Sequence, residues 1–193
     1  MRGGRRMNLA TKITLSRILA LPIIVVLFYV PFAYHRLVAA VVFVLAAITD
    51  MIDGKVARKR GEVTSLGKLL DPIADKVLAC SLLILEAASG LMMYDPAGII
   101  LTAIIVAREI GIGAFRTLAA HKGEILAADK FGKLKTIFTN VAIPVIMIGE
   151  LHDSIRIAGS AIFALAALFT VISGVNYIVK NRQVLAEGGE NGD

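Results

Sequence analysis

One uncharged run near the C-terminal end constrains the fold of this chain more than any other segment. Ile157–Val179 is 23 residues long and contains no charged side chain. About 20 consecutive apolar residues form a helix long enough to cross the hydrocarbon core of a membrane. The 193-residue chain is 57% hydrophobic with a mean hydropathy of +0.77, which is more apolar surface than a soluble globule of this size can bury. The sequence therefore predicts a membrane protein made of helices, whose backbone polar groups are paired within each helix.

Further apolar segments predict an all-α, polytopic protein with six transmembrane helices. The expected spans are Ile18–Phe32, Leu37–Arg58, Leu66–Met93, Ala97–Leu118, Lys133–Gly149 and Ile157–Val179. A short N-terminal interfacial helix is expected at Asn8–Arg17, before the first span. We expect residues 1–193 to form a single domain, with residues 1–17 as a cytoplasmic lead-in and residues 181–193 as a flexible tail.

The positive charges predict the orientation of these helices. Six spans place both termini on one side of the membrane, and every Lys and Arg except Arg36 and Arg156 falls on that side. The positive-inside rule makes that side cytoplasmic, so we expect a multi-pass protein of the cytoplasmic (inner) membrane. A net charge of +6 can also indicate nucleic-acid binding, but these basic residues flank apolar segments, so no nucleic-acid partner is expected. A single cysteine, Cys80, excludes an internal disulfide.

Two pairs of aspartates lie on either side of the polar turn between the second and third expected helices. One helical face carries residues at offsets of 0, 3, 4, 7 and 8, namely Asp50, Asp53, Gly54, Ala57 and Arg58. A face of the next helix carries residues spaced by four, namely Gly67, Asp71 and Asp75. Carboxylates at a membrane edge are costly unless their charge is offset. If the two faces meet, four carboxylates converge, and such oxygen ligands suit Mg²⁺ or Mn²⁺.

The metal interpretation depends on the two faces occurring together. Either aspartate spacing alone is common at helix caps and on solvated helix faces. The small residues Gly54, Ala57 and Gly67 leave room for a ligand to approach the backbone. A pair of bound ions can clamp a phosphate that undergoes in-line displacement, so the pattern favours phosphate-transfer chemistry.

The combined pattern resembles a known family signature. Asp50-x2-Asp53-Gly54-x2-Ala57-Arg58-x8-Gly67-x3-Asp71-x3-Asp75 is similar at every position to the signature of the CDP-alcohol phosphatidyltransferases. The resemblance covers most of the chain. It implies transfer of a substituted phosphate from a CDP-linked lipid to an alcohol, with release of CMP, by a homodimer that uses two Mg²⁺ or Mn²⁺ ions.

The same resemblance implies roles for individual residues. Asp50, Asp53 and Asp71 would ligate metal, and Asp75 would ligate metal and act as the catalytic general base. The nucleotide and diphosphate would be lined by Asp53, Gly54, Ala57, Arg58 and Gly67.

A second cluster is basic and lies on the same expected side of the membrane. Its members are Arg108, Glu109, Arg116, Lys133, Lys135 and the hydroxyl residue Thr136. Cations beside a metal site favour an anionic acceptor, because Lys holds a phosphate as a point charge and Arg holds it with two hydrogen bonds. Alternatively, these charges only orient the protein or bind anionic lipid headgroups.

The sequence around this cluster resembles one branch of the family, the phosphatidylglycerophosphate synthases. The resemblance rests on R-E-I-x5-R from Arg108, on G-K-L-K-T at Gly132–Thr136, and on Asn8, Thr14 and Arg17. It implies CDP-diacylglycerol, a membrane lipid, as donor and sn-glycerol 3-phosphate as acceptor. Inositol phosphate, serine and phosphatidylglycerol are the alternative acceptors.

A protein of another class, a small ion transporter, also uses carboxylates within the membrane. Transporters usually show internal repeats and binding sites at the bilayer midplane. We find no internal repeat here, and the aspartates lie near the cytoplasmic edge. Metal-dependent release of CMP would indicate the enzyme, whereas ion flux without CMP release would indicate transport.

Overall fold

The computed structural model describes the backbone of residues 9–60, 65–92, 96–123 and 130–183. It describes the side chains of residues 17–49, 51–52, 73–92, 96–123 and 130–183. Every regular element among these residues is helical. The elements are α1 (Leu9–Tyr29), α2 (His35–Arg60), α3 (Ser65–Ala88), α4 (Ala97–His121), α5 (Lys130–Met147), the 3₁₀ turn η1 (Ile148–Leu151) and α6 (Asp153–Lys180). This confirms the predicted all-α architecture with six long helices.

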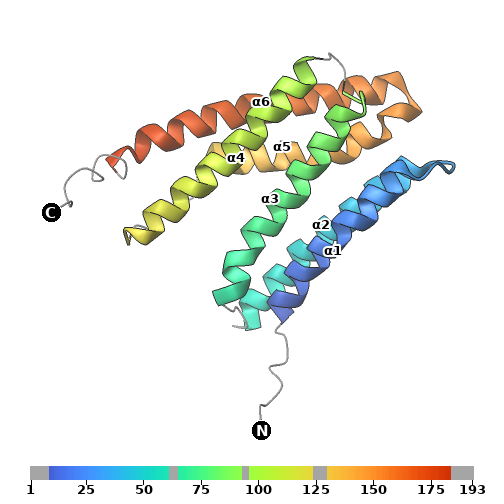
Figure 1. Cartoon of the computed structure of the whole chain (residues 1–193). Coiled ribbons are helices and arrows are strands. Elements are labelled where there is room, and N and C mark those ends of the chain that lie inside the picture. Colours follow the sequence, from blue (N-terminus) through green and yellow to red (C-terminus); the bar gives the residue numbers. More distant parts are fainter. Residues whose placement is uncertain (1–8, 61–64, 93–95, 124–129, 184–193) are drawn as a thin grey trace, which may run out of the picture.

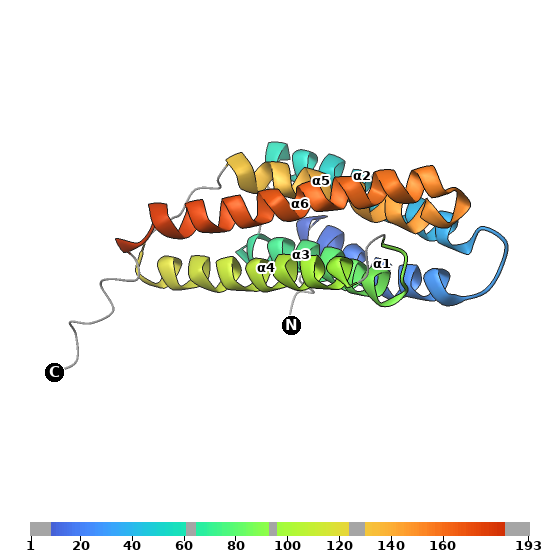
Figure 2. The same ribbon diagram turned by 90° about the horizontal axis from the view of Figure 1, so that it is seen from above.

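The six helices form two layers. Helices α1, α3 and α4 lie in one layer, and α2, α5 and α6 lie in the other (Figure 2). Contacts join neighbours within each layer and also link α1 to α2, α3 to α5 and α4 to α6 across the layers. The chain reverses direction at each connection (Figure 1). The start of α1, the end of α2, the start of α3, the end of α4, the start of α5 and the end of α6 therefore face the same end of the bundle.

The apolar character of the helices identifies a membrane protein. Among the described residues, α4, α5 with η1, and α6 are each long and apolar enough to cross a membrane. The apolar parts of α1 (Arg17–Tyr29) and α2 (His35–Thr49) are shorter. Large apolar side chains on the outer surface, such as Ile110 and Val179, are more than half exposed. Such a surface suits contact with lipid chains and would be costly in water.

The first helix differs from its prediction. Leu9–Tyr29 is one continuous helix with Pro22 inside it, so the segment expected to form a separate interfacial helix is the first part of α1. There is no Gly or Pro between Leu9 and Leu21 to break the helix. Proline within a membrane helix is tolerated because neighbouring groups satisfy the freed backbone carbonyl.

Other bounds shift by a few residues for local reasons. Helix α3 ends at Ala88 rather than Met93, because Gly90 adopts a positive φ of 62° and Leu91 N–H donates back to the Glu86 carbonyl at 3.4 Å. Helix α6 begins at Asp153, where the His152 ring accepts a hydrogen bond of 3.1 Å from the backbone N–H of Ser154.

Among the described residues, helices α5 and α6 make the most extensive contact of any pair of helices. A Cβ atom added at Gly159 would lie 3.0 Å from Ile146 Cγ1 and 3.1 Å from the Ile146 backbone nitrogen. Ile143, Ile146 and Phe163 are fully or almost fully buried along this contact. A small residue lets the two backbones approach, as is common between membrane helices.

Candidate active site

A cavity of about 850 Å³ lies between the helices, and all six long helices contribute to its lining. Its charged lining comes from α1, α3, α4 and α5, with Arg17, Asp75, Lys76, Arg108, Glu109, Arg116, Lys133 and Lys135. The apolar lining comes largely from α2 and α5, with Phe43, Val44, Ile48, Met51, Ile137, Val141, Pro144 and Val145. A cavity with both kinds of lining suits an amphiphilic ligand.

The aspartate motif is divided between two helices, as predicted. Asp50 and Asp53 lie in the last turns of α2, and Asp71 and Asp75 lie in the first turns of α3. The side chains of Asp50, Asp53 and Asp71 lie outside the described residues, so their convergence stays a prediction. The same holds for the predicted nucleotide-site residues Gly54, Ala57, Arg58 and Gly67.

Asp75 is the member of the motif whose side chain the structure describes. Its side chain is 64% exposed and lines the cavity. The Arg17 guanidinium on α1, which is only 3% exposed, pairs with the Asp75 carboxylate. The contact therefore combines a buried cation with a carboxylate that a ligand can reach.

The described part of the motif fits a divalent cation. Asp75 presents an accessible carboxylate oxygen, the kind of ligand that Mg²⁺ and Mn²⁺ take. Only residues 61–64 separate α2 from α3, and such a connection spans at most roughly 18 Å, so the two aspartate pairs lie at the same end of the bundle. Among the side chains that are described, no three of His, Cys, Asp and Glu cluster closely enough to hold a metal ion. Three of the four predicted ligands lie outside that set.

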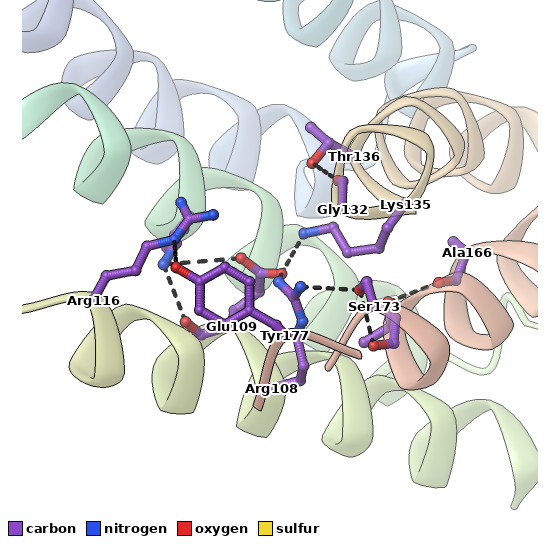
Figure 3. A network of polar contacts seen from close by, with 11 residues as sticks. Arg108, Glu109, Arg116, Gly132, Lys135, Thr136, Ala166, Ser173 and Tyr177 are labelled. Atoms are coloured by element: carbon purple, nitrogen blue, oxygen red, sulfur yellow. Dashed lines mark hydrogen bonds and ion pairs between the residues drawn. The ribbon is translucent and has the colours of Figure 1, made fainter. Parts of the chain in front are cut away.

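Glu109 is the centre of the basic cluster. This residue of α4 is 8% exposed, and its carboxylate pairs with Lys135 of α5 and lies 3.1 Å from Arg108 Nη1 (Figure 3). The carboxylate also lies 4.0 Å from Lys76 Nζ of α3. Cations from three helices thus meet at one buried carboxylate. Burial of these charges would be strongly unfavourable if they were not paired.

Arg108 is held by α6 as well as by Glu109. Its Nη2 donates a hydrogen bond of 2.9 Å to the Ser173 hydroxyl (Figure 3). Gly174 gives the side chain room, because a Cβ atom added there would lie 3.3 Å from Arg108 Cγ, whereas one at Gly132 would lie at an ordinary contact distance of 3.8 Å from Arg108 Nη2. The guanidinium is therefore fixed between α4, α5 and α6.

Arg116 is oriented by an aromatic residue of α6. Its Nε donates a hydrogen bond of 3.0 Å to the Tyr177 hydroxyl, and its guanidinium carbon lies 5.1 Å from the centre of the Tyr177 ring. Tyr177 is almost fully buried and packs edge-to-face against Phe115. Cation–π contact and the hydrogen bond together hold the Arg116 side chain at the cavity.

The last two predicted acceptor residues lie at the start of α5. Lys133 and Thr136 are exposed and line the cavity. The Thr136 hydroxyl donates a hydrogen bond of 3.0 Å to the Gly132 carbonyl (Figure 3). The structure thus brings all five residues predicted for an acceptor to the same cavity as Asp75.

Sequence reasoning did not single out Lys76, Ser173 or Tyr177. Lys76 follows Asp75 directly and looked like one more positive charge on the cytoplasmic side. Ser173 and Tyr177 lie within the apolar run of α6. Their spacing of four residues, which places two polar groups on one helical face, is the sequence pattern that could have identified them. Their contacts with α4 depend on how the helices pack.

Comparison with known proteins agrees with the signature. A family model described as CDP-alcohol phosphatidyltransferase matches residues 7–172. A protein of Bacillus subtilis (strain 168) named CDP-diacylglycerol–glycerol-3-phosphate 3-phosphatidyltransferase is 35% identical, and the match covers 92% of this chain and 97% of the relative. Proteins of the same name from Rickettsia typhi and Salmonella typhimurium are 36% and 37% identical, with 88% and 89% of this chain covered and 94% and 93% of theirs.

Proposed function

This chain belongs to the CDP-alcohol phosphatidyltransferase family, and from that premise we propose that it transfers the phosphatidyl group of CDP-diacylglycerol to sn-glycerol 3-phosphate. The products are phosphatidylglycerophosphate and CMP. One observation carries the choice of an anionic acceptor: the predicted acceptor cations line the same cavity as Asp75. The names of the similar proteins support both substrates.

The metal site is assigned to the four aspartates of the signature, Asp50, Asp53, Asp71 and Asp75. Its ions are Mg²⁺ or Mn²⁺, and two are expected. When bound, they supply positive charge that neutralises the donor diphosphate and the charge that builds on the departing CMP. The accessible carboxylate of Asp75 supports this assignment. The nucleotide and diphosphate are assigned to Asp53, Gly54, Ala57, Arg58 and Gly67.

Asp75 is also assigned as the general base. The acceptor hydroxyl is a poor nucleophile until a positioned base takes its proton. The Asp75 carboxylate accepts that proton as the hydroxyl oxygen forms a bond to the phosphorus of the phosphatidyl group. The bond from that phosphorus to the CMP oxygen breaks, and CMP leaves with the electron pair. Arg17 holds the carboxylate in place during this step.

The acceptor phosphate is assigned to the basic cluster. Arg108 and Arg116 offer planar guanidinium groups, and Lys133 and Lys135 offer point charges. The Thr136 hydroxyl adds a neutral donor. Because Glu109, Ser173 and Tyr177 hold three of these cations, the site is organised before the acceptor arrives, which lowers the entropic cost of binding.

The apolar lining supplies a place for the lipid. Side chains of α2 and α5 form most of it, and they continue from the charged lining in the same cavity. A diacylglycerol group can remain among apolar side chains while its diphosphate reaches the polar residues. Burial of apolar surface favours this placement by about 25 cal/mol per Å².

The membrane arrangement follows from the distribution of charge. We infer that both termini and the cavity face the cytoplasm in the inner membrane, where soluble CMP can leave and glycerol 3-phosphate can enter. Arg36 and Arg156 begin α2 and α6 at the other end of the bundle, which agrees with that orientation. Residues 1–193 are assigned to one domain, and the functional unit is proposed to be a homodimer.

The decisive experiment measures CMP release by purified protein in detergent micelles. CDP-diacylglycerol is supplied with sn-glycerol 3-phosphate, inositol phosphate, serine or phosphatidylglycerol in separate reactions. Release that depends on glycerol 3-phosphate supports the proposal, and release with another alcohol alone would replace the acceptor. Chelation by EDTA should abolish release, and Mg²⁺ or Mn²⁺ should restore it. Ion flux into vesicles without CMP release would instead support a transporter.

A further inference from the structure

We propose that Lys76 is a further binding residue for the phosphate of the acceptor. Lys76 lies on α3, directly after Asp75, and lines the cavity. The inference rests on the proposed function, because it concerns the same acceptor. It adds a cation from α3 to a site whose other members come from α4 and α5.

The ammonium group of Lys76 reaches across to α4. Its Nζ donates a hydrogen bond of 3.1 Å to the Glu109 carbonyl oxygen and lies 4.0 Å from the Glu109 carboxylate. An ammonium group has three N–H donors, and these two contacts use at most two of them. At least one donor can therefore be offered to a ligand in the cavity.

The backbone of α4 leaves space for this ammonium group. A Cβ atom added at Gly113 would lie 2.8 Å from Lys76 Nζ, which is closer than van der Waals contact permits. Gly113 lies in the middle of a helix, where glycine is destabilising by about 1 kcal/mol relative to alanine. Lys76 Nζ is the atom that occupies the space left by the missing side chain.

The balance of charge indicates what Lys76 binds. Lys76, Arg108 and Lys135 surround the single carboxylate of Glu109, so these described side chains carry an excess of two positive charges. A phosphate monoester carries about 1.5 to 2 negative charges at pH 7. A bound phosphomonoester would therefore neutralise the group, whereas neutralisation of Glu109 alone requires only one of the three cations.

The test uses two changes that act on the same ammonium group. Lys76→Met removes the charge and keeps an unbranched side chain. Gly113→Ala keeps the charge but pushes the flexible end of Lys76 away from its place. Gly111→Ala is the matched control, because a Cβ atom there has no neighbour within 4 Å and the gain in helix propensity is the same. CMP release is measured with one substrate varied while the other is saturating.

We expect Lys76→Met to raise the KM for sn-glycerol 3-phosphate about ten-fold or more, the usual effect of losing a charged hydrogen bond. The KM for CDP-diacylglycerol should stay near the wild-type value. Gly113→Ala should raise the acceptor KM in the same direction, with little further effect in the Lys76→Met background. Gly111→Ala should match the wild type.

Four outcomes would overturn the inference. The first is an unchanged acceptor KM in both variants, with or without a lower melting temperature, which would make Lys76 a structural residue. The second is a rise in the donor KM alone, which would assign Lys76 to the diphosphate. The third is a fall in kcat with both KM values unchanged. The fourth is additive effects of the two changes.

If Lys76→Met does not fold, Gly113→Ala decides between these results. Wild-type protein that releases no CMP with glycerol 3-phosphate would refute the proposed function itself.

Discussion

The guanidinium of Arg17 on α1 pairs with the carboxylate of Asp75 on α3, although 58 residues separate them in sequence. Arg17 is 3% exposed and Asp75 is 64% exposed. A buried arginine side chain has few accessible conformations. Arg17 therefore orients the Asp75 carboxylate without covering it. This arrangement suits the two roles proposed for Asp75, as a metal ligand and as the base that takes the proton of the acceptor hydroxyl.

We predict that Arg17→Met lowers kcat about ten- to a hundred-fold, because a misplaced catalytic group costs that much rate. The acceptor KM should change little, since Arg17 acts through Asp75. Arg36→Met is the matched control: Arg36 forms a comparable ion pair with Glu150, of 2.6 Å, at the other end of the bundle. Equal losses of kcat in the two variants would show that Arg17 only stabilises the fold.

Asp75→Asn tests the proposed base directly. The variant keeps the size of the side chain but cannot accept the proton, so CMP release should fall by at least about a hundred-fold. The protein should still fold and remain soluble in detergent, but with a lower melting temperature, because the buried Arg17 guanidinium loses its ion pair with Asp75. Asp153→Asn is the control, because Asp153 is 82% exposed and pairs with Arg156 one turn away. Purified Asp75→Asn protein with near-normal turnover would exclude the role.

Glu109→Gln tests the centre of the basic cluster. Three cations would then surround an uncharged amide, and breaking a buried ion pair costs about 3–5 kcal/mol. The melting temperature in detergent should therefore fall well below that of the wild type. Glu150→Gln removes a partly exposed carboxylate from its pair with Arg36, so its cost should be about 1 kcal/mol or less. A melting temperature for Glu109→Gln equal to that of Glu150→Gln would contradict the expected difference.

Much of the fold was predictable because a membrane helix is recognised from its own stretch of sequence, without knowledge of the residues that it packs against. Each span needs a long apolar segment, and Pro96 directly precedes α4. The end of α3 before Gly90 was not predicted. The family was predictable from the aspartate signature and is confirmed by the family match. The prediction of a separate N-terminal helix was wrong, because Leu9–Tyr29 forms one continuous helix. The start of the apolar segment at Ile18 does not interrupt the helix, since no Gly or Pro lies between Leu9 and Leu21.

The details of the site were predictable only in part. Arg108, Glu109 and Lys135 were identified as members of one charged cluster on the expected cytoplasmic side. Their contacts with one another and with Ser173 depend on which faces of α4, α5 and α6 meet, and a single sequence does not show how helices pack. Lys76 shows the same limit: its reach to Glu109 is set by the packing of α3 against α4.

The close contact between α5 and α6 provides a prediction that is independent of chemistry. Gly159→Ala adds a Cβ atom 3.0 Å from Ile146 Cγ1 and 3.1 Å from the Ile146 backbone nitrogen, and a backbone atom cannot move aside as the end of a side chain can. Such overpacking costs about 1–3 kcal/mol, which outweighs the gain in helix propensity of up to about 1 kcal/mol. The variant should unfold at a lower temperature in detergent than the wild type. Gly111→Ala has the same propensity gain without the steric conflict, so it should unfold at the wild-type temperature or above it. A melting temperature for Gly159→Ala that matches Gly111→Ala would mean that α5 and α6 are not held as closely as the structure describes.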